Sequence, residues 1–391
     1  MRILQIITQG ELGGAQKNVL DTSAYLSANN NVFIAIGATS APSDTWLLKE
    51  AKRANLKSEN LFIVPALVRE VSPLKDFRAF YEVYKLVKKI KPHIVHVHSS
   101  KAGVICGLAA KIAGSCVVYT VHGFVFSEPS SALKKSFFIL IEFIASFFRD
   151  LTITVSEFDR ELGRKFFIIR KNKNILIYNG IDIQNEKNIL PKDEARSFIL
   201  EKIGLKHLSG TSNPRIVGTV ANLYKTKGIK YLIESAKIVN DNLNLSEKIL
   251  FVVFGEGELR HKLTEEIAKN NLEEIFFLPG LIPNAYIYLR GFDLFTLPSI
   301  KEGFPYALLE VILAKIPFIA TDVGGISEIL KYAKGRLIPA GNAEALANAI
   351  TLHFSSLSTD QITLPDIFSS KNSFKLLSEQ YSNIMKKHRR C

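Results

Sequence analysis

The sequence of 391 residues contains only three cysteines, which are Cys106, Cys116 and Cys391. They are too few for a disulfide framework and have no metal-ligand spacing, so we expect a chain that works in a reducing cytoplasm. No Asp-x-Asp pair is present to carry a nucleotide-bound Mg²⁺ or Mn²⁺. A chemistry that depends on disulfides or on such a metal site is therefore not expected.

Long apolar runs are also missing. The run Phe137–Phe148 has 12 residues and contains Glu142, so it is too short to cross a bilayer. The N-terminal residues lack the apolar core and cleavage site of a signal peptide. We therefore expect a cytoplasmic chain, with peripheral contact to the inner face of the plasma membrane as its only route to a lipid surface.

Residues 132–149 form an apolar helix in which Lys135, Glu142 and Arg149 fall on one stripe. Such a helix is either buried in the protein or lies in a membrane interface. In the second case Lys134 and Lys135 would lie near lipid phosphates. The sequence leaves both alternatives open.

Positive charge is concentrated in the first half of the chain. Residues 1–184 carry 24 basic and 15 acidic side chains, which is a net charge of +9 out of the +13 of the whole chain. This balance favours an anionic partner such as a membrane face, a lipid phosphate or a nucleic acid, although a lysine-rich solvated surface is the alternative. Nucleic acid is not expected, because the basic residues share no face with interleaved aromatic residues.

Short apolar runs alternate with helical patterns along most of the chain, which is typical of βαβ units and a parallel sheet. We predict an α/β fold with two doubly wound, Rossmann-like domains facing a central cleft. The predicted parts are residues 1–183, a polar linker 184–214, residues 215–370, and a basic helix 371–391 that packs back on the first domain. Ligands bind beyond the carboxyl ends of the strands in such sheets, which favours an enzyme with two substrates.

The segment 297–310, Leu-Pro-Ser-Ile-Lys-Glu-Gly-Phe-Pro-Tyr-Ala-Leu-Leu-Glu, is the most informative one. It reads as a strand end, a tight loop and a helix start, with Pro305 at the first helical position. Unpaired N–H groups at a helix start suit phosphate. Glu302 and Glu310 flank the same loop and suit sugar hydroxyls, because carboxylates accept hydrogen bonds. The segment predicts a site for a sugar joined to a nucleotide by a diphosphate.

Other loops that follow predicted strands contain glycine or a basic residue. Gly13-Gly14 and Gly324-Gly325 either approach a ligand or cap a helix, and Glu328 either contacts a ligand or complements a helix dipole. Lys227 begins a helix and suits a diphosphate. His93, His96 and His98 form a cluster that suggests a metal, with His96 and His98 on one face of a strand. No third ligand of suitable spacing follows this pair, so no metal site is expected.

These motifs together resemble the retaining glycosyltransferases of family 4, which have the GT-B fold. The resemblance covers nearly the whole chain and is carried by five motifs in order. They are Gly13-Gly14-Ala15-Gln16, Thr120-Val121-His122-Gly123, Tyr178-Asn179-Gly180-Ile181-Asp182, Glu302-x7-Glu310 and Gly324-Gly325-x-x-Glu328.

The resemblance implies a role for each matching residue. Glu310 would bind the ribose, Glu302 with the Gly303, Phe304 and Pro305 backbone would hold the donor sugar, and Lys227 would neutralise the diphosphate. His122 would lie near the donor sugar at the reacting centre. The remaining donor-binding positions implied are Gly13, Gly14, Gly280, Leu281, Leu308 and Leu309.

One position departs from the family pattern. Many members have an arginine five residues before the lysine, but this chain has Asn222, and Lys225 is the nearby cation that substitutes for its charge. Positive groups near the leaving diphosphate would make a metal unnecessary, so no cofactor is expected. The chain offers no convincing second carboxylate for a double displacement of the glycosidase type, which favours front-face transfer with retention.

The resulting prediction is a transferase that moves a sugar from a nucleotide-diphosphate sugar, with UDP expected. The acceptor would be a glycan or a polyprenyl-linked glycan in bacterial envelope polysaccharide synthesis, with residues 132–149 at the membrane surface. A UDP-sugar 2-epimerase on the same fold is one alternative. A non-catalytic, membrane-associated scaffold is the other.

Overall fold

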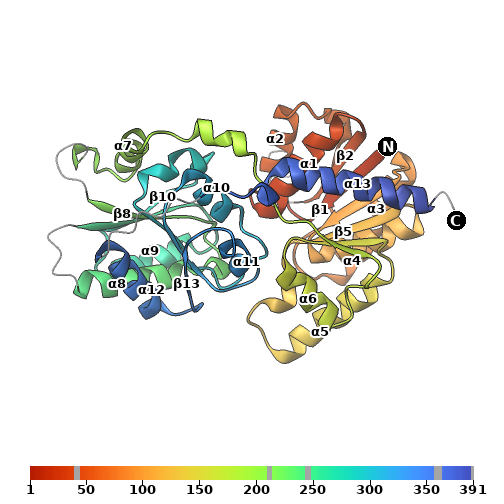
Figure 1. Cartoon of the computed structure of the whole chain (residues 1–391). Helices are drawn as coiled ribbons and strands as arrows, with labels where there is room; N and C mark the ends of the chain where they lie inside the picture. Colours follow the sequence, from red (N-terminus) through yellow and green to blue (C-terminus); the bar gives the residue numbers. More distant parts are fainter. Residues whose placement is uncertain (39–44, 209–213, 243–247, 356–362, 389–391) are drawn as a thin grey trace. The chain divides into compact units, whose positions relative to one another are not determined.

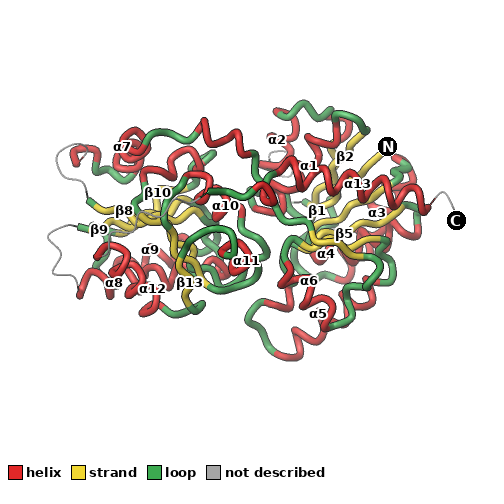
Figure 2. Tube along the Cα trace, viewed as in Figure 1, coloured by secondary structure: helices red, strands yellow, loops and turns green. Residues whose placement is uncertain are grey.

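The chain forms two compact α/β units in a computed structural model that describes residues 1–38, 45–208, 214–242, 248–355 and 363–388. The N-terminal unit comprises Met1–Asn179 together with the C-terminal residues from Lys371, and the C-terminal unit comprises Gly180–Ser370. Each unit has a parallel sheet covered by helices (Figures 1 and 2). The α/β prediction of two doubly wound domains is confirmed in this respect.

The sheet of the N-terminal unit has seven parallel strands in the order β3-β2-β1-β4-β5-β6-β7. The central strands β4 and β5 are buried along their whole length, because both faces of a parallel sheet are covered. The strands are β1 (Arg2–Ile7), β2 (Asn31–Gly37), β3 (Leu61–Val64), β4 (Ile94–His98), β5 (Cys116–Val121), β6 (Leu151–Thr154) and β7 (Asn174–Leu176).

Helices cover both faces of this sheet. One face carries α3 and α4, and the other carries α1, α2 and the C-terminal helix α13. Leu377 and Tyr381 of α13 belong to the second core, so this helix packs on the N-terminal unit (Figure 1, blue). The helices are α1 (Gly14–Ser27), α2 (Trp46–Arg53), α3 (Pro73–Ile90), α4 (Ser100–Ile112), α5 (Ala132–Ser146), α6 (Glu157–Lys165) and α13 (Ser370–His388).

The C-terminal unit has six parallel strands in the order β10-β9-β8-β11-β12-β13. They are β8 (Arg215–Val220), β9 (Ile249–Phe254), β10 (Phe276–Gly280), β11 (Leu294–Leu297), β12 (Phe318–Thr321) and β13 (Arg336–Ile338). The helices are α7 (Lys192–Lys202), α8 (Ile229–Asn242), α9 (Arg260–Lys269), α10 (Tyr306–Ala314), α11 (Ile326–Leu330) and α12 (Ala343–Ser355). The sequence pattern misses β13 because three residues with one buried side chain leave no readable period.

The segment predicted as a linker is folded where the structure describes it. It contains a 3-10 helix, Ile183–Asn188, and the helix α7, whose Ala195 and Ile199 are fully buried. Arg196 of α7 donates to Asp293 over 2.9 Å. The many charged residues of α7 hide its narrow apolar face, which makes the sequence look like a linker. Residues 209–213 of the predicted linker, and 389–391 of the predicted basic helix, lie outside the described residues.

The helix α5 (Ala132–Ser146) has a charged residue on its buried side and large apolar residues on its exposed side. Glu142 and Arg149 are almost fully buried and form an ion pair with 2.7 Å between Oε2 and Nη2. The Arg149 guanidinium lies 3.9 Å from the centre of the Tyr119 ring. By contrast, the large apolar side chains on the other side are exposed: Leu133, Phe137, Leu140, Phe143, Ile144 and Phe147. One side of the helix therefore packs on the core, with Phe138 and Ile139 beside the ion pair, and the other side presents apolar side chains outward.

Candidate active site

A lysine, a glutamate and a serine meet at the carboxyl edge of the C-terminal sheet. Lys227 follows β8, whereas Ser299 and Glu302 follow the neighbouring strand β11. Oε1 of Glu302 accepts hydrogen bonds from Nζ of Lys227 and from Oγ of Ser299, both over 2.7 Å. The Glu302 side chain is 8% exposed and that of Lys227 is 27% exposed. Lys227 and Glu302 are thus one charged unit with an accessible cationic end.

The two loops are joined by backbone contacts. The carbonyl oxygen of Thr226 accepts a hydrogen bond from the Ile300 N–H over 2.8 Å. Gly228 has a φ of +65°, and an added Cβ would lie 2.0 Å from the Pro298 oxygen. Glycine is needed at this position on both grounds. The close approach of these two loops holds Lys227 against Glu302.

The loop Gly324-Gly325 supports the Glu302 loop from the next strand, β12. The Gly325 N–H donates to the Gly303 oxygen over 2.9 Å. Gly324 has a φ of +58°, and a Cβ there would lie 1.9 Å from the Glu302 oxygen. Thr321 at the end of β12 donates from Oγ1 to the Ser299 oxygen over 2.5 Å. Backbone packing is therefore one established role of this glycine pair.

The predicted helix start of segment 297–310 lies one residue later than expected. Pro305 is the N-cap of α10, and Tyr306 is its first residue. Glu310 is half-buried and lies in α10. Phe304, Leu308 and Leu309 are buried, so their side chains pack in the core. Any ligand contact from Leu308 or Leu309 would have to come from the backbone.

The remaining predicted donor positions of this unit also follow strand ends. Asn222 follows β8 and is half-buried, whereas Lys225 is exposed in the 3-10 turn that also contains Lys227. Gly280 ends β10 with a φ of +100°, and its oxygen accepts from the Gly255 N–H over 2.9 Å. Leu281 next to it is 47% exposed.

His122 belongs to a buried hydrogen-bond network in the N-terminal unit. Its Nε2 lies 3.0 Å from Nδ1 of His98, and Nε2 of His98 lies 2.7 Å from Oε1 of Gln5. The three residues come from the neighbouring strands β5, β4 and β1 or from their carboxyl ends. His96 bonds separately, through Nδ1 to the Tyr381 hydroxyl and through Nε2 to the Thr120 hydroxyl, both over 2.6 Å.

Burial keeps these histidines neutral. Loss of water, together with the charge of His122, lowers the pKa of His96 to about 3. Burial also lowers the pKa of His98 well below its usual range and that of His122 to about 4. His93 lies apart from this network, where its Nδ1 accepts from the Arg2 N–H over 2.9 Å. Among the described residues no group of three His, Cys, Asp or Glu side chains is arranged to hold a metal.

The loop Gly13-Gly14 starts the first helix of the same unit. Gly13 is the N-cap of α1 and Gly14 its first residue, and the Gly13 oxygen accepts from the Lys17 N–H over 2.9 Å. The helix-cap alternative is thus met. A glycine here also leaves the first turn open to an approaching ligand, because no Cβ shields its N–H groups.

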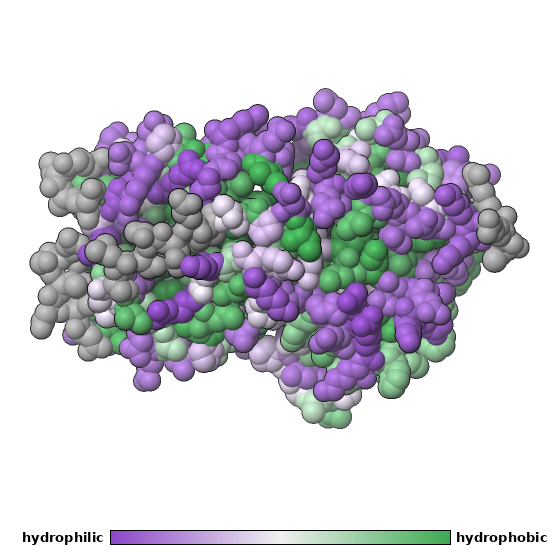
Figure 3. Space-filling view, in the orientation of Figure 1, coloured by the Kyte–Doolittle hydropathy of each residue, from purple (hydrophilic) through white to green (hydrophobic). Residues whose placement is uncertain are grey.

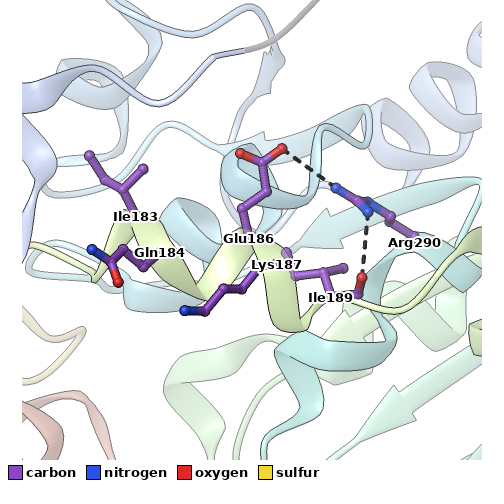
Figure 4. A pocket seen from close by; sticks show the side chains of 6 residues that line it. All are labelled: Ile183, Gln184, Glu186, Lys187, Ile189 and Arg290. Carbon is purple, nitrogen blue, oxygen red and sulfur yellow. Dashed lines mark hydrogen bonds and ion pairs between the residues drawn. The ribbon is translucent and has the colours of Figure 1, made fainter.

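An open hollow of about 520 Å³ lies elsewhere on the C-terminal unit (Figure 4). It is lined by Ile183, Gln184, Glu186, Lys187, Ile189 and Arg290, and none of these residues was predicted to bind substrate. Arg290 lies 3.6 Å from Glu186 in an ion pair. The hollow is a surface depression and does not include the Lys227 and Glu302 cluster.

Two participants, Ser299 and Gln5, were missed in the sequence, and His98 was considered there only as a metal ligand. Ser299 lies inside the segment 297–310, but its contact with Glu302 depends on how the loop folds back. Gln5 and His98 appear in the sequence as strand residues with polar side chains in buried positions. A buried polar residue in an apolar strand was the available signal, because such groups need partners.

Comparison with known proteins identifies the family. The family model described as Glycosyltransferase Family 4 matches residues 12–185, and the model described as Glycosyl transferases group 1 matches residues 206–359. An Escherichia coli UDP-Gal:alpha-D-GlcNAc-diphosphoundecaprenol alpha-1,3-galactosyltransferase is 33% identical over 299 residues, covering 75% of this chain and 74% of the relative.

A further relative is similar in sequence, and a solved structure is similar in fold. The putative teichuronic acid biosynthesis glycosyltransferase TuaC of Bacillus subtilis (strain 168) is 26% identical and covers 83% of this chain and 79% of the relative. The crystal structure of Anabaena Alr3699/HepE in complex with UDP and glucose matches with a TM-score of 0.77 at 18% identity, covering 98% of this chain and 100% of that chain. The fold is GT-B, and the chain belongs to glycosyltransferase family 4.

Proposed function

We propose that this glycosyltransferase moves a sugar from a UDP-sugar to a lipid-linked glycan in bacterial envelope polysaccharide synthesis, with retention of anomeric configuration. The observation that carries the proposal is the paired Lys227 and Glu302 at the carboxyl edge of the C-terminal sheet. The lysine ammonium suits a diphosphate, and the carboxylate beside it can accept hydrogen bonds from the hydroxyls of the attached sugar. The Escherichia coli relative, which is a UDP-Gal:alpha-D-GlcNAc-diphosphoundecaprenol galactosyltransferase, and the HepE structure in complex with UDP and glucose support these substrate classes.

The mechanism follows from where charge develops. When the bond from the anomeric carbon to the diphosphate breaks, the diphosphate gains negative charge and the sugar gains oxocarbenium character. Lys227 stabilises the leaving diphosphate, and the half-buried site strengthens this interaction. Glu302 holds the donor sugar by its hydroxyls, and Glu310 holds the ribose. The leaving phosphate helps to take the proton from the acceptor hydroxyl, so no metal is required.

A thermal-shift screen against UDP-, GDP- and ADP-sugars is the direct test of the donor. We expect only the UDP-sugars to raise the melting temperature, because a ligand that binds the folded state stabilises it. Transfer is then measured with a polyprenyl-diphosphate sugar, and the anomeric configuration of the product is read by NMR. An inverted anomer would contradict the retaining mechanism, and a stronger shift with GDP- or ADP-sugars would contradict the UDP assignment.

The two alternative functions give different results. A UDP-sugar 2-epimerase would convert the UDP-sugar without any acceptor, so the same reaction mixture without acceptor separates it from a transferase. A non-catalytic scaffold would leave cellular glycan output unchanged when Glu302 is replaced by alanine. We expect no conversion in the first experiment and loss of the glycan in the second.

The helix α5 supports contact with a membrane surface. Its ion pair of Glu142 and Arg149 faces inward, and it fixes which side of the helix faces outward, because rotating the helix would expose the pair and bury the apolar side. The outward side carries Leu133 and Phe137, which are 86% and 51% exposed, next to the exposed Lys134. Apolar side chains beside lysine suit the boundary of an anionic bilayer.

A second apolar set lies on α3. Leu74, Phe77 and Tyr81 are exposed and follow one another at helical spacing, and Lys85 lies 4.3 Å over the Tyr81 ring. The helix α4 packs against both α3 and α5, so the three helices form one layer of the N-terminal unit. Figure 3 shows hydrophobic surface at the lower edge of this unit, where α5 lies. No helix in the described part of the chain is long and apolar enough to cross a membrane.

Replacing Phe137 and Leu140 by serine is expected to release the protein from vesicles that contain anionic lipid. Burying one large apolar side chain stabilises the bound state by about 1.5–3 kcal/mol, so the double variant should bind at least 100-fold more weakly. Vesicle flotation measures the bound fraction. The matched control is Leu352→Ser, because Leu352 is 48% exposed on α12 of the other unit. Equal loss in the control, or no binding by the unaltered protein, would contradict membrane contact.

A further inference from the structure

The network around His122 has a direction that follows from the orientation of the Gln5 amide, whose Oε1 faces His98. Oε1 of Gln5 is an amide oxygen, which accepts hydrogen bonds and never donates. The bond of 2.7 Å to Nε2 of His98 therefore places a proton on that nitrogen. A neutral imidazole carries one N–H, so Nδ1 of His98 must be an acceptor.

The same reasoning extends to His122. Its Nε2 lies 3.0 Å from the acceptor Nδ1 of His98, so Nε2 of His122 must carry the proton and donate. Nδ1 of His122 then holds a free lone pair. Within the described residues this nitrogen makes no hydrogen bond, and the His122 side chain is half-buried and still partly accessible.

We propose that Gln5 and His98 are positioning residues that fix the tautomer of His122, so that its Nδ1 accepts a hydrogen bond from a hydroxyl of the sugar substrate. The inference rests on the proposed function, because it assigns a contact to the sugar. It also excludes one role for His122. An imidazole that stays neutral and presents a lone pair is a fixed acceptor for a hydroxyl, not a cation that stabilises the diphosphate.

The direction of these hydrogen bonds is fixed because Gln5 and His98 are buried. Gln5 and His98 are 0% exposed. Water therefore cannot replace a lost partner, and the direction of one bond sets that of the next. The lowered pKa of His98 and of His122 agrees with neutral rings near pH 7. The bond of the Thr120 hydroxyl to Nε2 of His96 provides a matched control, since it lies in the same buried cluster but does not involve Gln5, His98 or His122.

Long-range ¹H–¹⁵N NMR of protein labelled with ¹⁵N-histidine tests the proposal without an assay of activity. The His122 resonances are assigned by their loss in His122→Gln. We expect the Nε2–H tautomer of His122 at pH 7 in the unaltered protein. A proton found on Nδ1 would overturn the proposal, and this outcome is independent of whether the chain transfers a sugar.

Two variants distinguish the effect of the hydrogen bonds that link Gln5, His98 and His122 from a general effect on packing. Gln5→Met keeps the side-chain length but removes the accepting amide, so we expect a mixture of His122 tautomers and a fall in kcat of about three- to tenfold. Thr120→Val should keep both the tautomer and kcat, because it removes only the bond of the Thr120 hydroxyl to Nε2 of His96. An unchanged tautomer in Gln5→Met, or an equal change in Thr120→Val, would also overturn the proposal. A normal NMR result with no transferase activity would instead count against the proposed function.

Discussion

Lys227→Ala is expected to lower kcat/KM for the UDP-sugar by about a thousandfold. Removing one preorganised group that stabilises transition-state charge typically costs about 2.7–4 kcal/mol, which is a factor of 100 to 1000. The loss should be at the upper end here, because Asn222 brings no second charge and the variant leaves Glu302 without its partner 2.7 Å away. Initial rates measured over a range of donor concentrations give kcat and KM separately.

The neighbouring lysine provides the control. Lys225 lies in the same 3-10 turn and is exposed. Lys225→Ala should lower kcat/KM less than tenfold, because charges in contact with water interact weakly. Losses of equal size in the two variants would show that net charge near the site matters and that the position of Lys227 does not.

Glu302→Gln tests whether the pair acts as one unit. Glutamine keeps the size of the side chain but loses the charge that holds Lys227. We expect a loss of about 100-fold, and in the double variant with Lys227→Ala a total loss smaller than the product of the single losses, since residues in contact are not additive. Fully multiplicative losses would indicate that Lys227 and Glu302 act independently on the substrate.

Acidification from pH 7 to pH 5 is expected to destabilise the N-terminal unit by about 4 kcal/mol through the two fully buried histidines, His96 and His98. Burial lowers the pKa of His96 to about 3 and that of His98 well below its usual range, whereas in the unfolded chain each titrates near 6.5. Between these values the unfolded state binds protons that the folded state rejects. Stability is therefore complete above about pH 6.5 and falls by about 1.4 kcal/mol per pH unit for each histidine.

The single tryptophan of the chain makes this measurement specific. Trp46 lies in α2 and packs against the core that contains Tyr381, so its fluorescence follows unfolding of the N-terminal unit. Urea titrations at several pH values give the slope of stability against pH. His96→Gln should lower that slope by the equivalent of about one bound proton, whereas His261→Gln should not change it, since His261 lies in α9 of the other unit. An unchanged slope in His96→Gln would contradict neutral burial of His96.

Much of the fold can be read from the sequence because a parallel sheet buries whole strands. The strands β9 and β11, for example, are short apolar runs that are buried along their whole length. Apolar runs of this kind depend on local residues alone. The errors occur where charged residues cover an apolar face, as in α7, or where a strand is as short as β13.

The sequence by itself determined the family, the two α/β domains and the loops that carry Lys227, Glu302 and His122, because these depend on local patterns and on motifs in order. Only the tertiary structure decided which groups meet. It joined Lys227 to Glu302 and His122 to Gln5 through His98, although the partners are far apart in the chain. It also turned the apolar side of α5 outward. Neighbouring strands in a doubly wound sheet are distant in sequence, so no local pattern reports which of their ends lie side by side.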